Sequence, residues 1–575
     1  KKEKGELKLA VPDVRTYIQA SGRTSRLFAG GVTKGLSLIM VDDAKVFRGL
    51  VRTMRWMFPE SEFEEFEQMD IKKLIEEINE DRARVKALMK GEAKAVTKDL
   101  VKSALMIVES PNKARTIANF FGKPSRRRIG KLICYEVNTG DYILTIVATA
   151  GHVVDLVTNE GYDGILKLDD RFVPVYASIK RCPKCGSQFV EYNGKCPKCG
   201  SDEVIDKLET LLTLTELAQE VDEVFIATDA DAEGEKIAWD VYLALKPYVS
   251  KLMRTEFHEV TKRAIREAIA NRRSINEKLV EAQIVRRIED RWIGFSLSKL
   301  LWKRFKNNKL SAGRVQTPVL GWIIQRNEEY KRSFTTFTTI KLENGIRFTV
   351  EGYVSPSRVK VKEVKIEEVE INPKPPYTTD AMLKDASALL KFSADYTMKL
   401  AQDLFELAFI TYHRTDSTRV SNVGIRIAKD YIEDEIGKDF FKPRVWGEGG
   451  AHECIRPTRS IDMPRLIKLL KEGIITPVKR LTMDHIRLYD LIFRRFVASQ
   501  MRSVKVVKQV VKFEVDGKEV EVEGYVDVKF DGWSKVWRLS MEKHPKVVEG
   551  TELTVALSLI HISEPTRPLY ISYAV

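Results

Sequence analysis

The sequence predicts a multidomain protein of mixed α/β and α+β class, and three observations lead to this prediction. The 575 residues exceed the size of one ordinary domain. Short apolar runs at 104–108, 142–148 and 224–227 alternate with helical patterns, which is typical of a parallel sheet covered by helices. Residues 334–372 and 503–556 instead alternate apolar and charged side chains, which favours antiparallel strands.

Helical patterns fill most of the chain between these strands. Residues 70–90 repeat apolar side chains with the helical period, and Asp70 is expected to cap that helix. Residues 259–333 and 378–495 are also expected to be rich in helix. Nearer the start, a polar Gly-rich turn precedes an apolar run at 36–41, which we expect to be a buried strand.

Composition limits the partners of the protein without identifying one. Lys and Arg number 96 against 82 Asp and Glu, a net charge of +14. This excess suits a polyanion such as DNA, but an ordinary basic protein would have it too. The sequence has no apolar run of the roughly 20 residues that a membrane span needs, and its first residues have no secretory pattern. We therefore expect a cytoplasmic protein without a membrane partner, acting as a monomer, and the sequence to be a piece of a longer chain.

Carboxylates follow two of the predicted parallel strands. Glu109 comes directly after the run at 104–108, and Asp229, Asp231 and Glu233 come after the run at 224–227. Because ligands bind beyond the carboxyl ends of parallel strands, these side chains are expected at one edge. Alternating carboxylates persist best beside a cation, and their hard oxygens suit Mg²⁺. The alternative is a solvated acidic turn at a helix N-terminus.

Four of the six cysteines form two closely spaced pairs. Cys182 and Cys185 make one C-x-x-C pair, and Cys196 and Cys199 make the other. This spacing is a strong indication of a tetrahedral Zn²⁺ site, and four thiolates would make the zinc structural. The two separate cysteines, Cys134 and Cys454, are expected to be small buried apolar residues.

The strand–Glu and strand–D-x-D-x-E-G-E segments together resemble the Toprim fold. That resemblance implies that Asp229, Asp231 and Glu233 bind Mg²⁺ with Glu109, which also acts as the acid or base. Burial and neighbouring carboxylates raise the pKa of a glutamate towards useful values. Lys113, one helical turn beyond Glu109, is expected to contact the scissile phosphate.

The segment Ile-Thr-Tyr412-His-Arg414-Thr-Asp closely resembles the active-site segment of type IA DNA topoisomerases. A tyrosine is a weak nucleophile near neutral pH and needs nearby positive charge, which Arg414 would supply. Taken alone, a tyrosine here would more often be a buried structural residue. The resemblance implies that Tyr412 is the nucleophile, which would remain attached to the 5′ end of the cut strand.

Four other segments match the same family in the same order. Ala-His452-Glu-Cys-Ile-Arg456-Pro resembles its A-H-E-A-I-R-P motif, with Cys454 in place of alanine. The resemblance implies a catalytic role for His452 and DNA-binding roles for a group of residues that line the single-strand groove. That group comprises His152, Arg286, Arg287, Asp290, Arg314, Gln316 and Arg456.

Near the start, Gln-Ala-Ser-Gly-Arg23-Thr-Ser-Arg26 resembles the sixth motif of superfamily-two helicases, whose arginines reach ATP. A solvated basic turn is the alternative. The order of a helicase-like segment, a Toprim domain with a zinc knuckle and a type IA body is similar to that of reverse gyrases. No G-K-[ST] phosphate loop is present, so we expect ATP to serve only the intact protein.

These resemblances imply a Toprim domain, helical domains and a β-rich arch that form a type IA torus around single-stranded and duplex DNA. The expected segments are 1–50, end of a second helicase-like domain; 51–102, helical linker; 103–258, Toprim domain with a zinc-knuckle insertion at 180–203; 259–333, first helical DNA-binding part; 334–377, first part of the arch; 378–495, helical domain with the tyrosine; 496–556, return of the arch; and 557–575, an artefactual tail resembling translated sequencing-adapter sequence.

The implied function is cleavage and rejoining of one DNA strand within an ATP-dependent reverse gyrase that introduces positive supercoils. Three rivals remain. An ordinary type IA topoisomerase would not explain the segment around Arg23. A Toprim primase or nuclease would explain the carboxylates and cysteines but not residues 410–418. A zinc-dependent DNA-binding protein with an inactive site is the non-enzymatic alternative.

Overall fold

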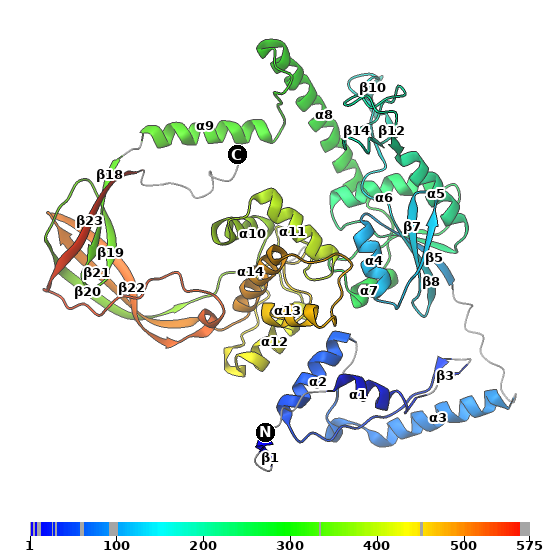
Figure 1. Ribbon diagram of the computed structural model, residues 1–575, viewed down its shortest axis with the longest axis horizontal. Helices are drawn as coiled ribbons and strands as arrows, with labels where there is room; N and C mark the ends of the chain where they lie inside the picture. The colour runs from blue at the N-terminus through cyan, green and yellow to red at the C-terminus, as the bar shows by residue number, and fades with distance from the viewer. Residues whose placement is uncertain are drawn as a thin grey trace.

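The computed structural model describes residues 2–3, 6–7, 13–25, 27–28, 31–57, 63–90, 102–332, 335–448 and 452–563. In Figure 1 the chain path leads from the first helices to a parallel sheet, along two helices to an antiparallel arch, and back through a helical body to the sheet. The last four parts follow one another around a ring.

The first part of the chain is mainly helical. Its elements are β1 (Lys2–Glu3), β2 (Glu6–Leu7), α1 (Val14–Ser21), β3 (Leu27–Phe28), β4 (Gly31–Val32), α2 (Ala44–Met57), η1 (Phe66–Gln68) and α3 (Ile71–Met89). The predicted cap of α3 is confirmed, because the Lys73 amide donates to Asp70 Oδ1 at 3.1 Å. The predicted buried strand at 36–41 is wrong: these residues form no strand, and Met40 is 98% exposed. A strand needs a neighbour for its backbone groups, and this segment pairs with none of the described strands.

A six-stranded sheet forms the next part, in the order β17-β16-β5-β8-β7-β6. The first four strands are parallel, as predicted, and β7 and β6 are antiparallel. Its elements are β5 (Lys102–Val108), α4 (Pro111–Asn119), β6 (Ser125–Ile129), β7 (Leu132–Asn138), β8 (Tyr142–Ala148), α5 (Lys207–Gln219), β16 (Glu223–Ile226), α6 (Ala232–Leu245), β17 (Leu252–Arg254) and α7 (Lys262–Ala270).

Alternate residues of β5 point into two different cores. Met106 belongs to the core that contains α4 and α7, whereas Leu105 belongs to the core that contains α5 and α6. The helices therefore cover both faces, and the carboxyl edge of the sheet is left free for side chains from the loops.

Small strands between β8 and α5 carry the cysteines. They are β9 (Val154–Leu156), β10 (Ile165–Leu168), β11 (Arg171–Pro174), β12 (Tyr176–Ser178), β13 (Lys180–Arg181), β14 (Gln188–Phe189) and β15 (Ile205–Asp206). Strands β14, β13 and β15 form a three-stranded sheet around the four cysteines. Two helices then leave the sheet, α8 (Glu277–Phe305), which packs on α6, and α9 (Gln316–Arg332), which has no buried residue.

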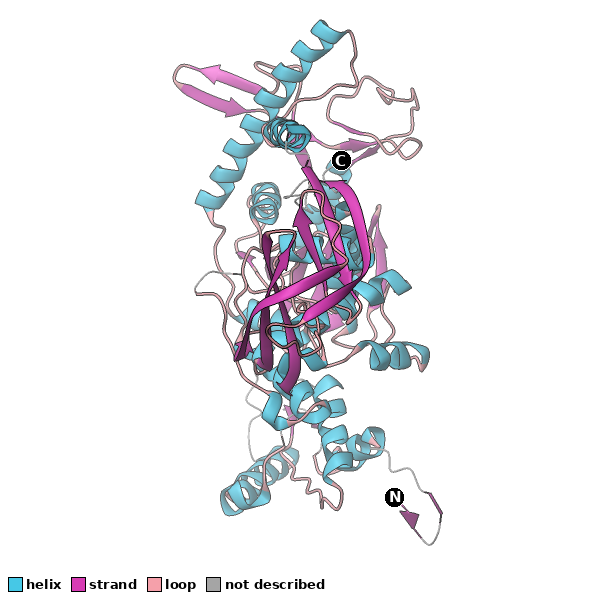
Figure 2. Ribbon diagram, turned by 90° about the vertical axis from the view of Figure 1, so that its left-hand side faces the viewer, coloured by secondary structure: helices cyan, strands magenta, loops and turns pink. Residues whose placement is uncertain are grey.

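The arch is a second six-stranded sheet, antiparallel throughout and strongly twisted in Figure 2. Its order is β19-β18-β23-β20-β21-β22. The strands are β18 (Thr335–Leu342), β19 (Arg347–Glu351), β20 (Arg358–Ile371), β21 (Val504–Val515), β22 (Lys518–Phe530) and β23 (Glu552–Ser563), with η4 (Gly532–Lys535) after β22.

The helical body lies between β20 and β21 in the chain. It consists of α10 (Thr379–Asp385), the π-turn η2 (Ala386–Leu390), α11 (Ala394–Glu406), α12 (Asn422–Glu435), η3 (Lys438–Phe440), α13 (Met463–Lys471) and α14 (Met483–Ser499). Helix α11 packs on α4, so this body and the parallel sheet share one apolar core.

Three predicted boundaries fall inside single elements and are wrong as structural divisions. Helix α2 crosses 50/51, and its Leu50 and Met54 pack together against Val14. Helix α14 crosses 495/496. Strand β23 crosses 556/557 and pairs with β18 as far as Ser563, although residues 557–575 were expected to be an artefactual tail. Residues 564–575 lie outside the described residues, and the origin of this segment stays a prediction.

Candidate active site

The two predicted groups of carboxylates meet at the carboxyl edge of the sheet. The Asp229 amide, just after β16, donates to Glu109 Oε1, just after β5, at 2.9 Å. Burial, together with the charge of Asp229, raises the pKa of Glu109 to about 7. A glutamate in this state can hold a proton near neutral pH and release it readily.

Asp231 has two different partners. It caps α6, because its Oδ1 accepts from the Gly234 amide at 2.7 Å. A Cβ at position 234 would lie 2.2 Å from the Asp229 carbonyl oxygen, so only glycine allows this close approach. The other oxygen, Oδ2, accepts from the Tyr412 hydroxyl at 2.5 Å. The residue is therefore both the predicted helix-terminal carboxylate and a partner of the predicted nucleophile.

Tyr412 comes from the helical body, yet its hydroxyl reaches the sheet. Its side chain is buried, with the Phe405 ring at 5.1 Å and the His452 ring stacked at 6.3 Å between centroids. Burial and the neighbouring carboxylate of Asp231 raise the pKa of the Tyr412 hydroxyl. The site as it stands therefore holds Tyr412 as a neutral phenol, and added positive charge would favour its ionisation. His452 Nδ1 is buried and has no hydrogen-bond partner among the described residues.

Three basic side chains surround the acidic triplet. Lys113, which is fully buried, forms an ion pair with Asp229. Arg414 Nη1 lies 3.3 Å from Glu233 Oε2 and 3.8 Å from Asp231 Oδ2. His152 Nε2 lies 2.9 Å from Glu233 Oε1, and this hydrogen bond lowers the pKa of Glu233 to about 2. Glu233 is therefore ionised under any ordinary condition.

A pocket opens over these residues and continues along α8. Its lining includes all four carboxylates together with His413 and Arg414. A second pocket, lined by Asp231, Glu233 and Arg414, extends to Arg286, Arg287 and Asp290 on α8. Of the remaining predicted groove residues, Arg314 bonds Asp290 at 2.9 Å and Gln316 bonds Ser311 at 3.2 Å. A continuous surface therefore joins Tyr412 to the predicted groove residues of α8.

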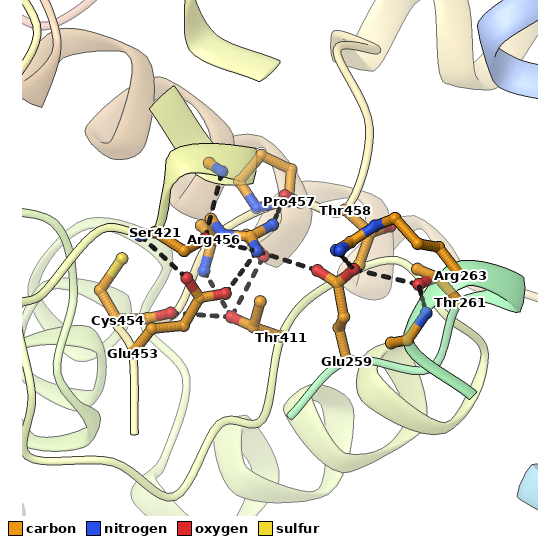
Figure 3. A network of polar contacts seen from close by, with 12 residues as sticks. Glu259, Thr261, Arg263, Thr411, Ser421, Glu453, Cys454, Arg456, Pro457 and Thr458 are labelled. Carbon is orange, nitrogen blue, oxygen red and sulfur yellow. Dashed lines mark hydrogen bonds and ion pairs between the residues drawn. The ribbon is translucent and has the colours of Figure 1, made fainter. Parts of the chain in front are cut away.

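Arg456 is a correction to the predicted groove. We expected it to contact DNA, but it is 1% exposed and its Nη2 pairs with Glu259 Oε2 at 2.9 Å and with Glu453 (Figure 3). A guanidinium enclosed in this way cannot reach a DNA phosphate without opening the interface around it. Its place in the structure indicates a role in holding segments together.

Sequence reasoning missed Arg254, which holds the loop after β16. It is 1% exposed, donates to the Asp229 carbonyl oxygen at 2.7 Å, and pairs with Glu235 at 2.9 Å. Glu259, at the end of the same segment, was also missed. A signal for both was available, because charged residues alternate with apolar ones in Arg254-Thr-Glu-Phe-His-Glu259-Val, directly after an apolar run.

The four cysteine sulfurs cluster as the spacing predicted. The ligand atoms of Cys182, Cys185, Cys196 and Cys199 lie within 4.8 Å of one another. Within the described ranges this is the only group of three or more His, Cys, Asp or Glu side chains that converges so closely. The carboxylates at Tyr412 are more widely spaced, as suits a cation that keeps part of its water shell. Cys134 and Cys454 are fully buried, as predicted.

Of the two helicase-like arginines, the structure describes one. Arg23 is exposed in the turn after α1, and Arg26 lies outside the described residues. Among the helices of the described ranges, none combines the length and the apolar character that crossing a membrane requires.

Two family profiles match the chain. The profile of DNA topoisomerases matches residues 274–353 and 339–573, and the Toprim domain profile matches residues 104–260. The Toprim match contains the parallel sheet with Glu109 and the acidic triplet. The topoisomerase match contains α8, the arch and Tyr412.

Comparison with curated proteins finds reverse gyrases. That of Pyrococcus furiosus is 58% identical over 562 residues, covering 96% of this chain and 46% of that protein. Reverse gyrase 1 of Aquifex aeolicus is 45% identical over 547 residues, covering 93% of this chain and 45% of that protein. The chain therefore spans about half the length of these relatives.

Among solved structures, full-length topoisomerase I from Thermotoga maritima has a similar fold. The TM-score is 0.58 with 30% sequence identity, covering 81% of this chain and 72% of that one. The parallel sheet, the arch and the helical body thus make the fold of a type IA topoisomerase, as the sequence predicted. Since the topoisomerase profile alone matches more than half of the residues, the chain belongs to the DNA topoisomerase family.

Proposed function

We propose that this chain cleaves and rejoins one DNA strand through a 5′-phosphotyrosine bond at Tyr412, within an ATP-dependent reverse gyrase that introduces positive supercoils. The observation that carries the proposal is the position of the Tyr412 hydroxyl, 2.5 Å from Asp231 in a pocket that Glu109 also lines. The test is to trap the intermediate with denaturant after incubation with a labelled single-stranded oligonucleotide. A covalent adduct that maps to Tyr412 supports the proposal, and its absence refutes it.

The chemistry assigns one proton transfer to each side of the reaction. The Tyr412 oxygen attacks phosphorus and gives its proton towards Asp231, its hydrogen-bond acceptor. The bond to the 3′ oxygen breaks, and that oxygen takes a proton from Glu109, whose pKa near 7 suits a general acid. Arg414 and Lys113 stabilise the charge on the phosphoryl oxygens. Attack by the free 3′ hydroxyl reverses each transfer, so rejoining requires no ATP.

The charge balance supports a divalent cation at this site. Glu109, Asp229, Asp231 and Glu233 line the pocket, and only Lys113 and Arg414 are permanent cations paired with them. This leaves an excess of negative charge, and oxygen ligands of this kind fit Mg²⁺. A bound Mg²⁺ would supply positive charge to the phosphate and to the tyrosine oxygen.

We expect Glu109→Gln to slow strand cleavage by about a hundredfold or more, because an amide keeps the shape but has no acidic proton to give. The rate of adduct formation in a single turnover measures this. Glu160→Gln removes a charge from an exposed loop and is the matched control. Cleavage at the wild-type rate by Glu109→Gln would remove Glu109 from the mechanism.

The cysteine cluster supports one structural Zn²⁺ per chain. We expect Cys182→Ser with Cys185→Ser to abolish zinc retention and to loosen residues 180–203, because two of four thiolates are lost. Metal analysis and limited proteolysis measure the two effects. Cys134→Ala removes a buried cysteine outside the cluster and should keep the metal. Purified wild-type protein without zinc would contradict this site.

DNA contacts are proposed along α8 and its neighbours. His152, Arg286, Arg287, Asp290, Arg314 and Gln316 would hold the single strand that leads to Tyr412. The continuous pocket along α8 supports this path. The net charge of +14 supports phosphate binding in general.

Positive supercoiling is proposed because the reverse gyrases resemble this chain over nearly all its length. The second candidate is relaxation of negative supercoils alone, which the likeness to a bacterial topoisomerase I favours. The full-length protein decides between them on a two-dimensional gel. ATP-dependent positive topoisomers support the first candidate, and relaxation that ATP does not change supports the second.

A further inference from the structure

Three short segments lie side by side next to the tyrosine. The Tyr412 amide donates to the His258 carbonyl oxygen at 2.8 Å, and Thr411 forms a β-bridge with Glu259. On the other side the Thr411 amide donates to the Arg456 carbonyl oxygen at 2.9 Å. The tyrosine segment is therefore the middle strand of a small ladder. Its outer strands come from the end of the Toprim domain and from residues 455–457.

The side chains of the two outer strands meet across the middle one. Arg456 Nη2 lies 2.9 Å from Glu259 Oε2, and the two residues are 1% and 6% exposed (Figure 3). Glu453 also pairs with Arg456, and Arg263 lies 2.9 Å from the second oxygen of Glu259. A Cβ at Gly424 would lie 2.9 Å from Arg456 Cδ, so the glycine leaves room for the buried guanidinium. The Glu259–Arg456 ion pair thus clamps the ladder.

The clamp acts where the reacting atom cannot. The only side-chain hydrogen bond of Tyr412 to the sheet that is found among the described residues runs from its hydroxyl to Asp231. That bond loses its proton when the oxygen becomes esterified to DNA. The ladder and the ion pair do not involve the hydroxyl, so they remain available after cleavage. Buried charges are stable only while paired, so separating the outer strands is strongly disfavoured.

We propose that Glu259 and Arg456 are positioning residues whose buried ion pair keeps the 410–412 segment seated on the Toprim domain. They hold the Tyr412 oxygen in register with Asp231 and Glu109 both before and after the strand is cut. Neither residue touches the reacting atoms. The inference rests on the proposed role of Tyr412 as nucleophile.

The test compares Glu259→Gln, Arg456→Gln and the double variant. Glu267→Gln is the control, because Glu267 is exposed and pairs with Arg263 at 2.8 Å without touching the ladder. Three quantities are measured: the single-turnover rate of adduct formation, the affinity for the same oligonucleotide in a Tyr412→Phe background, and hydrogen exchange of the 407–415 peptide against that of α14. Glu259→Asp, which keeps the charge but shortens its reach, takes the place of Glu259→Gln if the latter does not fold.

We expect each single variant to slow adduct formation by roughly tenfold to a hundredfold, since small displacements of a nucleophile cost that much. The double variant should be no slower than the slower single variant, because both changes break one ion pair. Oligonucleotide affinity should stay within about twofold, and exchange should accelerate at 407–415 but not in α14.

Additive losses, a loss of affinity that matches the loss of rate, or equal acceleration in α14 would each overturn the clamp. A wild-type protein that forms no adduct would instead refute the proposed function. The exchange comparison would then still decide whether the ion pair holds the segment.

Discussion

Tyr412→Phe is expected to form no covalent adduct with DNA at any protein concentration. The phenyl ring keeps the packing of the tyrosine against Phe405, at 5.1 Å between centroids, and loses only the oxygen that contacts Asp231. No other group in the pocket can replace that oxygen, since the neighbouring hydroxyl of Thr411 is buried and bonded to the Cys454 carbonyl. The SDS-resistant adduct with an end-labelled oligonucleotide measures the effect.

DNA affinity separates this result from a loss of folding. Tyr412 is 2% exposed, so Tyr412→Phe should bind the oligonucleotide within about twofold of the wild type. Tyr396→Phe is the matched control, because its hydroxyl also donates to a carboxylate, Asp484 at 2.8 Å, but lies on the surface of α11. An adduct in Tyr412→Phe, or its loss in Tyr396→Phe, would show that the nucleophile is misassigned.

The sequence predicted the acidic edge well, because a simple rule applies there. Neighbouring parallel strands end at the same edge, so Glu109 and Asp229 had to meet if both apolar runs were strands. The cysteine cluster followed in the same way, since the C-x-x-C spacing alone fixes the geometry of each pair. In both places local patterns decide the outcome.

The approach of Tyr412 to that edge did not follow from any local pattern. The tyrosine and Asp231 are 181 residues apart, and their contact depends on how α11 packs on α4. Only the resemblance to a family linked the two. Arg456 shows the opposite error, because a motif arginine was assigned to DNA although the fold encloses it between Glu259 and Glu453. Sequence pattern identifies such a residue but does not reveal whether it faces a ligand or a neighbouring segment.

Domain boundaries failed for a related reason. Boundaries were placed where composition changes, but a helix can continue through such a change when its apolar face remains buried. Leu50 and Met54 on α2 keep packing against Val14 across the expected boundary at 50/51. In α14, Phe496 and Val497 stay in the core beyond residue 495. Burial rather than composition sets where these elements end.

Asp229→Asn with Asp231→Asn is expected to reduce DNA relaxation by about a thousandfold, equivalent to about 4 kcal/mol of transition-state stabilisation. The amides keep the size of both side chains, so the cap of α6 and the packing around Tyr412 should survive. They remove two of the four charges that would attract Mg²⁺, and they leave Lys113 without its anionic partner. An uncompensated lysine beside the site should weaken divalent-ion binding further.

Titration with Mg²⁺ shows whether the loss comes from the cation site. The variant should need a much higher Mg²⁺ concentration for half-maximal relaxation, and its thermal midpoint should no longer rise with added Mg²⁺ as that of the wild type should. Asp169→Asn with Asp170→Asn removes the same charge from the exposed β10–β11 turn and should leave both titrations unchanged. If the Asp229 and Asp231 variant followed the wild-type Mg²⁺ titration in both assays, the carboxylates after β16 would not be the cation site. The activity would then depend on Mg²⁺ bound elsewhere, such as on the DNA itself.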